Sequence, residues 1–259
     1  MIKKIAILLF LLTLGITYAH AQSDTLRFMT YNILHGATTK GDFNLDAIAQ
    51  PIENLNPDFV AMQEVDFRTN RAQKYDLVTE LGWRTKMAPL FARAMPYDGG
   101  EYGEGVLSKY SFISTRNYPL PNRPGSEPRA ALSVIVSTPS GDTLQFVGTH
   151  LDHVRNSPDR IAQAEELVRL FADSPYPTII AGDLNATPDS EAMKILFKAF
   201  TPASSPEKAE YTFPSDHPRI KIDYVLYSHG QDWQVVNTKV VCDTYVTDHC
   251  YYYVDLILE

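Results

Sequence analysis

The sequence predicts an α/β fold in which mixed β-sheets are covered by helices. Short runs rich in β-branched and aromatic residues recur along the chain, which is typical of strands. Between them lie segments whose apolar residues repeat with helical spacing. Residues 139–142, PSGD, separate two strand-like runs and are typical of a hairpin turn. Helices interleaved with many strands, at least two of them in a hairpin, favour mixed sheets with helices packed on them.

The strands are predicted from their content of β-branched and aromatic residues. The run Thr178 to Ala181, for example, is short and apolar, which is typical of a strand covered on both sides. In chain order, strands are predicted over residues 26–33, 59–65, 105–113, 131–138, 143–149, 178–183, 222–227, 234–241 and 251–258.

Three helices are predicted between the strands. Residues 44–55 form the first, although Pro51 inside it indicates a kink or a late start. The second takes Ser157 as its cap and Pro158 as its first position, and the third begins in the same way at Thr187 and Pro188. The expected buried faces are Leu45, Ile48, Ile52 and Leu55, then Ile161, Ala164, Val168 and Phe171, and finally Met193, Leu196, Phe197 and Phe200.

The segment Pro177 to Pro188, PTIIAGDLNATP, carries two polar residues at the end of a buried strand. Gly182 lets the backbone pass close to a neighbour. Asp183 and Asn185 stand on alternate positions, so that a carboxylate and a carboxamide face the same small volume. An Asx-rich turn that leads into a helix is the alternative interpretation.

Two more polar residues end the first two predicted strands. Asn32 ends the first, where it is either a site residue or a simple turn residue. Glu64 ends the second, in which Val60 and Met62 are expected to be buried. A carboxylate in such a place is costly unless it is paired or bound to a cation, so we favour a cation ligand over a solvated Glu.

Other titratable residues follow the same pattern further along the chain. His150, Asp152 and His153 follow an apolar strand, where an isolated His is more often structural. Asp223 stands among apolar neighbours. Asp248 and His249 stand just before the final strand. A His that lies in this way between a carboxylate and a strand is a plausible acid or base.

The residues at or just beyond the predicted strand ends offer hard oxygen ligands and two imidazoles, with no thiol site: Asn32, Glu64, His150, Asp183, Asn185, Asp223, Asp248 and His249. Carboxylates of this kind suit Mg²⁺, and Mn²⁺ or Ca²⁺ as alternatives. Mg²⁺ typically completes its shell with water and with the phosphate oxygens of a substrate.

The first residues are typical of a secretory signal peptide. Lys3 and Lys4 precede an apolar run from Ile5 to Ile16, and a small-residue site ends at Ala21. The run is too short for a membrane span and no Cys follows it, so neither a helical anchor nor lipidation is expected. We expect a signal peptide over residues 1–21 and, over residues 22–259, one soluble monomeric domain that is secreted or periplasmic, since no linker or repeat divides it.

Charge and cysteine content add two expectations. The formal net charge is −8, and it becomes more negative once the two signal lysines are removed. This argues against a protein that holds nucleic acid mainly by neutralising phosphates, although it is compatible with a local basic patch. Cys242 and Cys250 are the only cysteines, and they are either a local disulfide or two buried thiols.

The order of the motifs YN, QE, TH, GDLN, IDY and DH resembles the endonuclease/exonuclease/phosphatase superfamily, also called deoxyribonuclease-I-like. The resemblance covers essentially all of residues 22–259. It implies a four-layer α/β/β/α sandwich of two mixed β-sheets, with the site at one end of the paired sheets.

The resemblance also implies a role for each matching residue. Glu64 would hold the divalent cation, with Asn32 and Asp248 near it. Asp183 would orient or deprotonate the attacking water. The remaining matches are Asn185 and Asn32 for binding the scissile phosphate, His249 as an imidazole fixed by Asp223, and His150 for contacting the phosphate or assisting the leaving oxygen.

Two further positions are matched more loosely. Glu104 would support His150 from behind, and Arg129 would reach the phosphate, with a surface salt bridge as the alternative for each. Asp152 lies outside the matched set and is expected among the substrate-binding residues, with a solvated side chain as the alternative. The same two interpretations apply to His153, Arg68, Arg71 and Arg155.

The resemblance therefore implies a metal-dependent phosphoesterase that acts by attack of an activated water. We expect a small or lipid-derived phosphodiester or phosphomonoester rather than DNA, because of the net charge and because no basic and aromatic interleaved loop is present. The alternatives are a secreted nuclease, a binding protein that keeps the fold without turnover, and a metallophosphatase built around two ions.

Overall fold

The computed structural model describes residues 25–205, 207 and 210–259, and there the strands form two six-stranded sheets. The predicted signal peptide, residues 1–21, lies outside the described residues. The first sheet has the order β11 (Trp233–Val241), β12 (Tyr251–Leu258), β1 (Thr25–Asn32), β2 (Phe59–Phe67), β4 (Gly100–Ser108) and β3 (Ala88–Tyr97). The second has the order β5 (Phe112–Pro119), β6 (Ala130–Ser137), β7 (Thr143–His150), β8 (Thr178–Asp183), β10 (Asp223–Ser228) and β9 (Phe200–Pro202).

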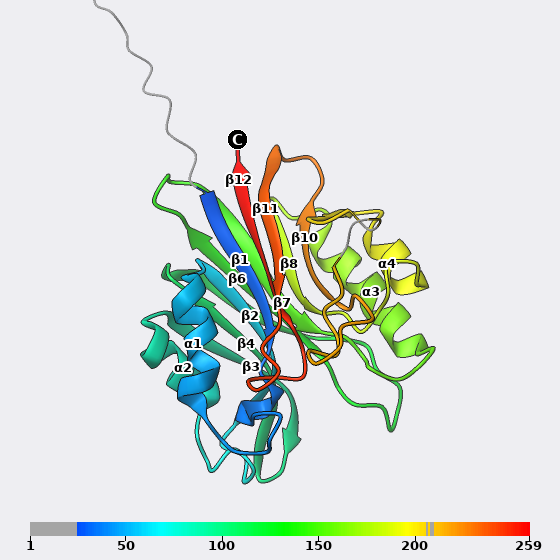
Figure 1. The fold of residues 1–259 in the computed structure, drawn as a ribbon. Coiled ribbons are helices and arrows are strands. Elements are labelled where there is room, and N and C mark those ends of the chain that lie inside the picture. The colour runs from blue at the N-terminus through cyan, green and yellow to red at the C-terminus, as the bar shows by residue number, and fades with distance from the viewer. Residues whose placement is uncertain (1–24, 206, 208–209) are drawn as a thin grey trace, which may run out of the picture.

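Helices cover the outer faces of both sheets (Figure 1). α1 (Leu45–Leu55) and α2 (Leu77–Thr85) lie outside the first sheet, and α3 (Pro158–Phe171) and α4 (Glu191–Leu196) lie outside the second. Both sheets are mixed, because β1 and β2 are parallel, as are β7 and β8, whereas the other neighbours are antiparallel. The predicted four-layer α/β/β/α sandwich is confirmed. Among the described residues no helix is both long enough and apolar enough to cross a bilayer.

Three apolar layers hold the sandwich together, one between the sheets and one under each helix pair. The layer between the sheets is centred on Phe28, Phe59 and Phe146, all fully buried. Phe28 stacks on Phe59 with ring centroids 5.1 Å apart, and the Phe59 and Phe146 centroids are 5.2 Å apart. Aromatic pairs at these distances add to the stabilisation that comes from burying their area.

Two of the three predicted helices have the predicted caps or bounds. In α1, Asn44 is the N-cap and accepts from the Ala47 amide, and the helix continues through Pro51 without a late start. In α3, Ser157 accepts from the Arg160 amide. Burial in α3 differs from the expected face, because Gln163 and Leu167 are buried whereas Ile161 and Val168 are half-buried.

The prediction for the third helix is wrong at its start. α4 begins after Ser190, whose hydroxyl accepts from the Met193 amide. The Thr187 hydroxyl is used instead in a turn, where it donates to Asp189. Phe200, expected on the buried face of this helix, belongs to β9.

The prediction of one strand over residues 105–113 is also wrong. β4 ends at Ser108, whose hydroxyl accepts from the Tyr110 amide in a turn, and β5 starts only at Phe112. The hairpin partner β3 was missed because it contains Pro89 and Pro96. β3 is an edge strand, where a residue without an N–H is tolerated. α2 and β9 were missed as well.

Gly182 fulfils the prediction of a close backbone approach. It pairs with Thr149 of the parallel neighbour β7, and a Cβ atom on Gly182 would lie 2.0 Å from the Thr149 carbonyl oxygen. Gly182→Ala should therefore cost about 2–3 kcal/mol of unfolding free energy, measured by urea denaturation. Its activity should also fall, because the clash displaces the adjacent Asp183.

The matched control is Gly148→Ala on β7. The nearest atoms to a Cβ there are side-chain carbons at 3.2 and 3.3 Å, which can shift slightly. Equal stability losses in the two variants would show that the contact with Thr149 is not what requires glycine.

Candidate active site

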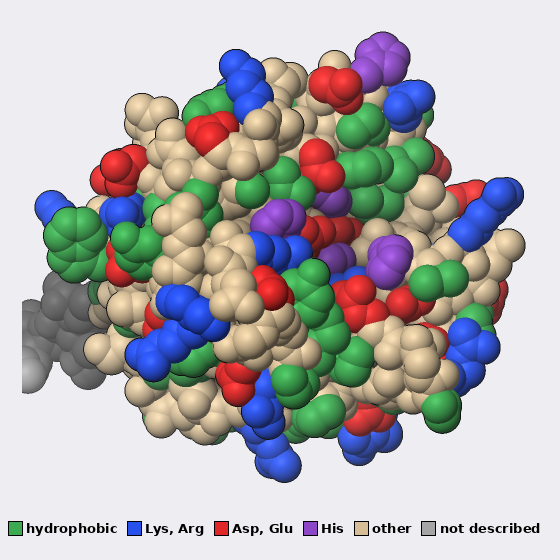
Figure 2. Space-filling view, turned by 90° about the horizontal axis from the view of Figure 1, so that it is seen from below, with side chains coloured by type: hydrophobic (Ala, Val, Ile, Leu, Met, Phe, Trp, Pro, Cys, Tyr) green, Lys and Arg blue, Asp and Glu red, His purple; other side chains and the backbone are tan. Residues whose placement is uncertain are grey.

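The strand register collects polar side chains at one end of the two sheets. His150, Asp183 and Asp223 form one row across β7, β8 and β10, because His150 pairs with Asp183 and Asp183 pairs with Asp223. Asn32 ends β1 in the facing sheet. Seen from that end, histidines and acidic residues gather in a central hollow (Figure 2). The carboxyl ends of β1, β2, β7 and β8 thus meet in one place.

The backbone of β2 turns Glu64 into this hollow. The pairing of β2 with β4 shifts register between Met62 and Val65, and Glu64 has φ +57°. Such a bulge re-aims a side chain. The Asn32 amide donates to Glu64 Oε1 (3.1 Å), and His35 Nδ1 lies 3.5 Å from Oε2. Burial raises the pKa of Glu64, but His35 and Asn32 outweigh it and lower this pKa below its usual value, so Glu64 is ionised.

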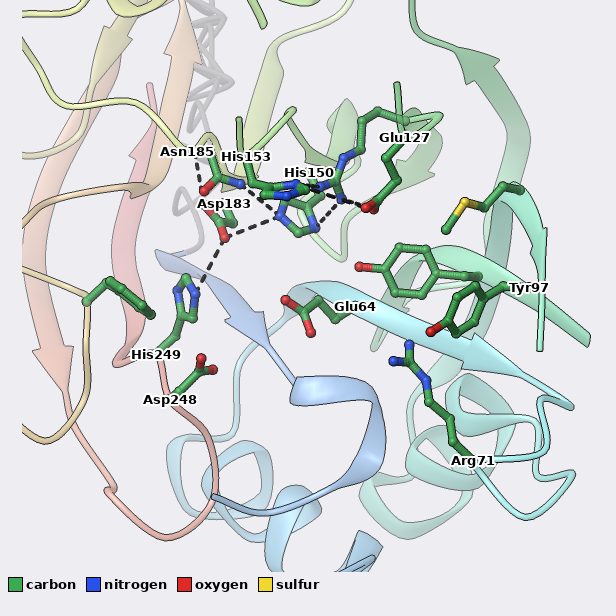
Figure 3. A pocket seen from close by; sticks show the side chains of 14 residues that line it. Glu64, Arg71, Tyr97, Glu127, His150, His153, Asp183, Asn185, Asp248 and His249 are labelled. Carbon is green, nitrogen blue, oxygen red and sulfur yellow. Dashed lines mark hydrogen bonds and ion pairs between the residues drawn. The ribbon is translucent and has the colours of Figure 1, made fainter. Parts of the chain in front are cut away.

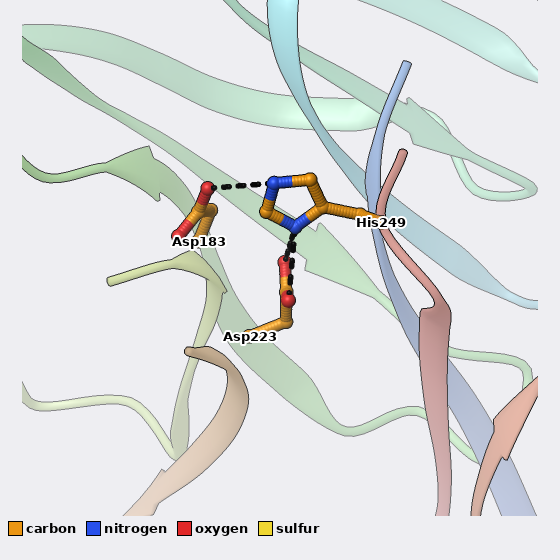
Figure 4. Close-up of side chains that lie close together, drawn as sticks. All are labelled: Asp183, Asp223 and His249. Atoms are coloured by element: carbon orange, nitrogen blue, oxygen red, sulfur yellow. Dashed lines mark hydrogen bonds and ion pairs between the residues drawn. The ribbon is translucent and has the colours of Figure 1, made fainter. Parts of the chain in front are cut away.

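An imidazole lies between two buried carboxylates (Figure 4). His249 Nδ1 is 3.1 Å from Asp223 Oδ2, and its Nε2 is 3.6 Å from Asp183 Oδ2. Burial lowers the pKa of His249, but Asp223 and Asp183 outweigh it and raise it to about 10. Burial raises the pKa of Asp183 to about 7, with further increases from Asp223 and Glu64 against the opposing charge of His249. The site thus combines a cationic imidazole with an unusually basic carboxylate.

His150 faces hydrogen-bond donors on both ring nitrogens. Arg129 Nη1 lies 2.9 Å from His150 Nδ1, and Asn185 Nδ2 lies 2.9 Å from His150 Nε2. Asp183 Oδ2 lies 3.4 Å from the same Nε2 (Figure 3). Burial and the charge of Arg129 set the pKa of His150 well below its usual value. The positive charge on this side of the hollow is therefore that of Arg129.

Asp248 and His249 lie in a loop that is held in place by a disulfide and by hydrogen bonds. Cys242 and Cys250 form a disulfide that closes it, which resolves the alternative left open by the sequence. The Thr247 hydroxyl donates to the Asn32 carbonyl (2.8 Å), and the Ser215 amide donates to the Asp248 carbonyl (2.7 Å). These contacts fix the loop to β1 and to the segment that contains Ser215.

Two sets of residues could hold a divalent cation. The side chains of Asp183, Asp223 and His249 lie close enough together for one ion, but both imidazole nitrogens already face a carboxylate. Glu64 and Asp248 offer oxygens that are not committed in this way. Asp248 Oδ1 is buried without a hydrogen-bond partner, and burial together with the charge of Glu64 raises the pKa of Asp248. Crowded carboxylate oxygens fit a hard cation, so we favour Glu64 and Asp248, with Asn32 orienting Glu64.

Two predicted residues lie elsewhere than expected. Asp152 does not line the hollow, because its carboxylate is buried and accepts from the Val154 amide. Glu104 is fully buried, but it makes no hydrogen bond to His150 and neither of its oxygens has a partner among the described residues. Burial raises the pKa of Glu104 well above its usual value, and the charge of Arg129 opposes this while those of Asp183 and Glu64 add to it.

The hollow is a cavity of about 330 Å³ with a second wall that the sequence did not predict. Tyr97, Tyr102 and Arg71 line this wall. Tyr97 and Arg71 lie opposite His249 (Figure 3). Buried Asp66 holds the Arg71 guanidinium through two hydrogen bonds of 2.7 and 2.8 Å. The Cζ atom of Arg71 lies over the Tyr97 ring, 4.6 Å from the ring centroid. The one available signal was Arg71 itself, which the sequence left as either substrate-facing or solvated.

The family model of the endonuclease/exonuclease/phosphatase family matches residues 29–249 of this chain. The chain belongs to this family. Family members are hydrolases that act on phosphoester bonds, among them phosphatases and nucleases. The match spans all the motifs from Asn32 to His249 that form the cavity.

Solved structures of other family members share the fold. One from Bacteroides vulgatus has a TM-score of 0.73 at 23% identity, over 91% of this chain and 100% of that chain. A mannosyl-6-phosphatase from Bacteroides thetaiotaomicron has a TM-score of 0.68 at 17% identity, over 89% of this chain and 99% of that chain. The D. rerio TDP2 structure with a single-strand DNA product has a TM-score of 0.69 at 18% identity, over 90% of this chain and 98% of that chain.

Proposed function

We propose that this family member is a divalent-metal-dependent phosphoesterase that hydrolyses small phosphomonoesters or phosphodiesters by attack of an activated water. The observation that carries the proposal is the arrangement of Asp183, flanked by His249 and His150 and facing Glu64 across one cavity. A carboxylate suited to act as general base, further carboxylates suited to a hard cation, and hydrogen-bond donors all line it, which supports the proposal.

Each side chain has a chemical role in this proposal. Asp183, with its raised pKa, accepts the proton of the attacking water. His249, held cationic by Asp223, donates to a phosphoryl oxygen as charge develops there, and Arg129 contributes positive charge on the opposite side. A divalent cation, when bound at Glu64 and Asp248, supplies Lewis-acid stabilisation of the same oxygens.

The cavity supports a small substrate. Its volume of about 330 Å³ is enclosed on the far side by Tyr97, Tyr102 and Arg71, which would contact the part of the substrate that carries the phosphate. The Arg71 charge is already balanced by Asp66, so this wall favours a polar neutral group such as a sugar or polyol over a second anion. The mannosyl-6-phosphatase in the same family is consistent with such a substrate.

A hydrolysis screen tests the proposal. The protein should release phosphate from sugar phosphates or cleave bis(p-nitrophenyl) phosphate with Mg²⁺, and EDTA should abolish both activities. A secreted nuclease is the second candidate, favoured by the likeness to the DNA-bound structure. EDTA-sensitive nicking of plasmid DNA that exceeds all small-molecule turnover would establish the nuclease instead.

We also propose that the protein is exported, as expected from residues 1–21. The disulfide between Cys242 and Cys250 supports this, since disulfides persist mainly in oxidising compartments. N-terminal sequencing of the protein recovered outside the cytoplasm should begin near Gln22.

A further inference from the structure

A second hollow adjoins the active-site cavity on the side away from Tyr97. We call it the basic groove; it has a volume of about 570 Å³. His153, Asn185, Phe213 and His249 line both hollows, so one layer of side chains separates them. The groove's own lining includes Arg155 and Asn156, which precede α3, and Arg160 in its first turns.

The charges of the two hollows are opposite. Four carboxylates line the active-site cavity, those of Glu64, Glu127, Asp183 and Asp248, whereas no carboxylate lines the basic groove. The formal net charge of the chain is −8, so acidic residues outnumber basic ones. A groove lined by arginines and by no carboxylate therefore differs from the chain as a whole.

The two arginines of the groove also lack carboxylate partners. Elsewhere in the described chain most arginines are ion-paired, as Arg71 is with Asp66 and Arg27 with Asp255. No described carboxylate lies within 4 Å of the Arg155 or Arg160 guanidinium. Arg160 donates to the carbonyl oxygen of Asp152 (2.6 Å), which orients a half-buried guanidinium without neutralising it.

The nearby acidic groups do not cancel this charge. Asp152 and Asp183 are the carboxylates whose charge reaches Arg160. Both are 1% exposed and neither lines the groove, so neither presents its carboxylate to a ligand there. The open face of the groove is cationic, and guanidinium groups suit the geometry of phosphate oxygens.

We infer that the basic groove binds a second phosphoryl group of the substrate, so that the preferred substrates are small molecules with two phosphoryl groups. This inference rests on the proposed function, because one phosphoryl group occupies the cavity at Asp183 while the other is held by Arg155 and Arg160. The neutral part of the molecule lies between them, with Phe213 and His153 on the groove side and the wall of Tyr97 and Arg71 on the other.

Kinetics with matched substrates test the inference. The protein should hydrolyse glucose 1,6-bisphosphate with a kcat/KM at least about tenfold above that for glucose 6-phosphate or glucose 1-phosphate. In Arg155→Gln/Arg160→Gln, KM for the bisphosphate should rise about tenfold or more with a small change in kcat, while KM for the monophosphates changes much less. The control is Arg116→Gln, which removes an equally unpaired arginine on β5, outside both hollows, and should leave the substrate preference intact.

Three outcomes would overturn the inference. One is equal kcat/KM for the bisphosphate and the monophosphates, and another is an equal loss for both kinds of substrate in the double variant. The third is a preference for the dinucleotide pTpT over the bisphosphate that the double variant removes, which would assign the groove to the neighbouring phosphate of a nucleic acid.

A binding measurement separates this inference from the proposed function. Calorimetry should show that glucose 1,6-bisphosphate binds more tightly than glucose 6-phosphate, and that the double variant loses the difference, whether or not the protein turns either compound over. Absence of all hydrolysis with this binding pattern would reject the proposed function but keep the groove. Hydrolysis without the binding difference would reject the groove alone.

Discussion

Asp183→Asn is expected to reduce the hydrolysis of bis(p-nitrophenyl) phosphate or a sugar phosphate by about 10³-fold or more. The carboxamide cannot accept a proton from water, although it has nearly the same shape as the carboxylate. The negative charge beside His249 Nε2 and His150 Nε2 is also lost. The measurement is kcat/KM with saturating Mg²⁺, alongside thermal unfolding.

The same substitution should not reduce stability. The pKa of Asp183 is raised to about 7 on folding, so the folded protein binds this proton more tightly than the unfolded chain. Stability contributed by the protonated carboxyl is therefore lost as the pH rises through about 7. In EDTA, the melting temperature of Asp183→Asn minus that of the unchanged protein should become larger as the pH rises from 5 to 8.

Asp189→Asn is the matched control, because this aspartate belongs to the loop after the same strand and bonds only locally with Thr187. It should retain activity. If Asp183→Asn retained activity, or lost it only because the protein unfolded, the assignment of Asp183 as general base would be wrong.

Glu64→Gln is expected to weaken divalent-cation binding strongly and to lower kcat/KM by about 10³-fold, which corresponds to several kcal/mol of Lewis-acid stabilisation. The carboxylate is held ionised by Asn32 and His35, and a neutral amide in its place removes the charge while keeping the volume. Calorimetric titration with Mn²⁺ and Mg²⁺ measures the first effect, and substrate turnover measures the second.

The comparison that decides between the two candidate cation sites is Glu64→Gln against Asp223→Asn. Cation affinity lost in the Asp223 variant and kept in the Glu64 variant would place the ion at Asp183, Asp223 and His249 instead. Glu101→Gln on β4, where the carboxylate pairs with Arg93, is a control that should affect neither binding nor turnover.

Local sequence patterns were sufficient for much of the fold. The strands of the two sheet centres and helices α1 and α3 follow from apolar runs and from caps such as Ser157, because these preferences act over a few neighbouring residues. The elements that were missed, such as β3 with its two prolines, are possible only because of their place at a sheet edge. No local pattern contains that information.

For the candidate site, too, some features could be predicted from local sequence and others could not. The motifs identified Asn32, Glu64, His150, Asp183, Asp223 and His249 as residues that meet. The expectation that Glu64 ends its strand is wrong, because Glu64 stands at a bulge within β2, and His249 lies in the loop before β12. The motifs did not show that Asp152 is buried away from the cavity, nor that Arg71 and Tyr97 form its far wall.

By itself, then, the sequence determined which residue types stand at the strand ends and which chemistry they are suited to. Only the tertiary structure decided which of them face one another: the pairing of His150, Asp183 and Asp223 in one row, the bulge that aims Glu64, and the unpaired arginines of the basic groove. The physical reason is that the charge state and orientation of these groups depend on burial and on partners that are distant along the chain. A side chain's type is fixed locally, but its surroundings are created by packing.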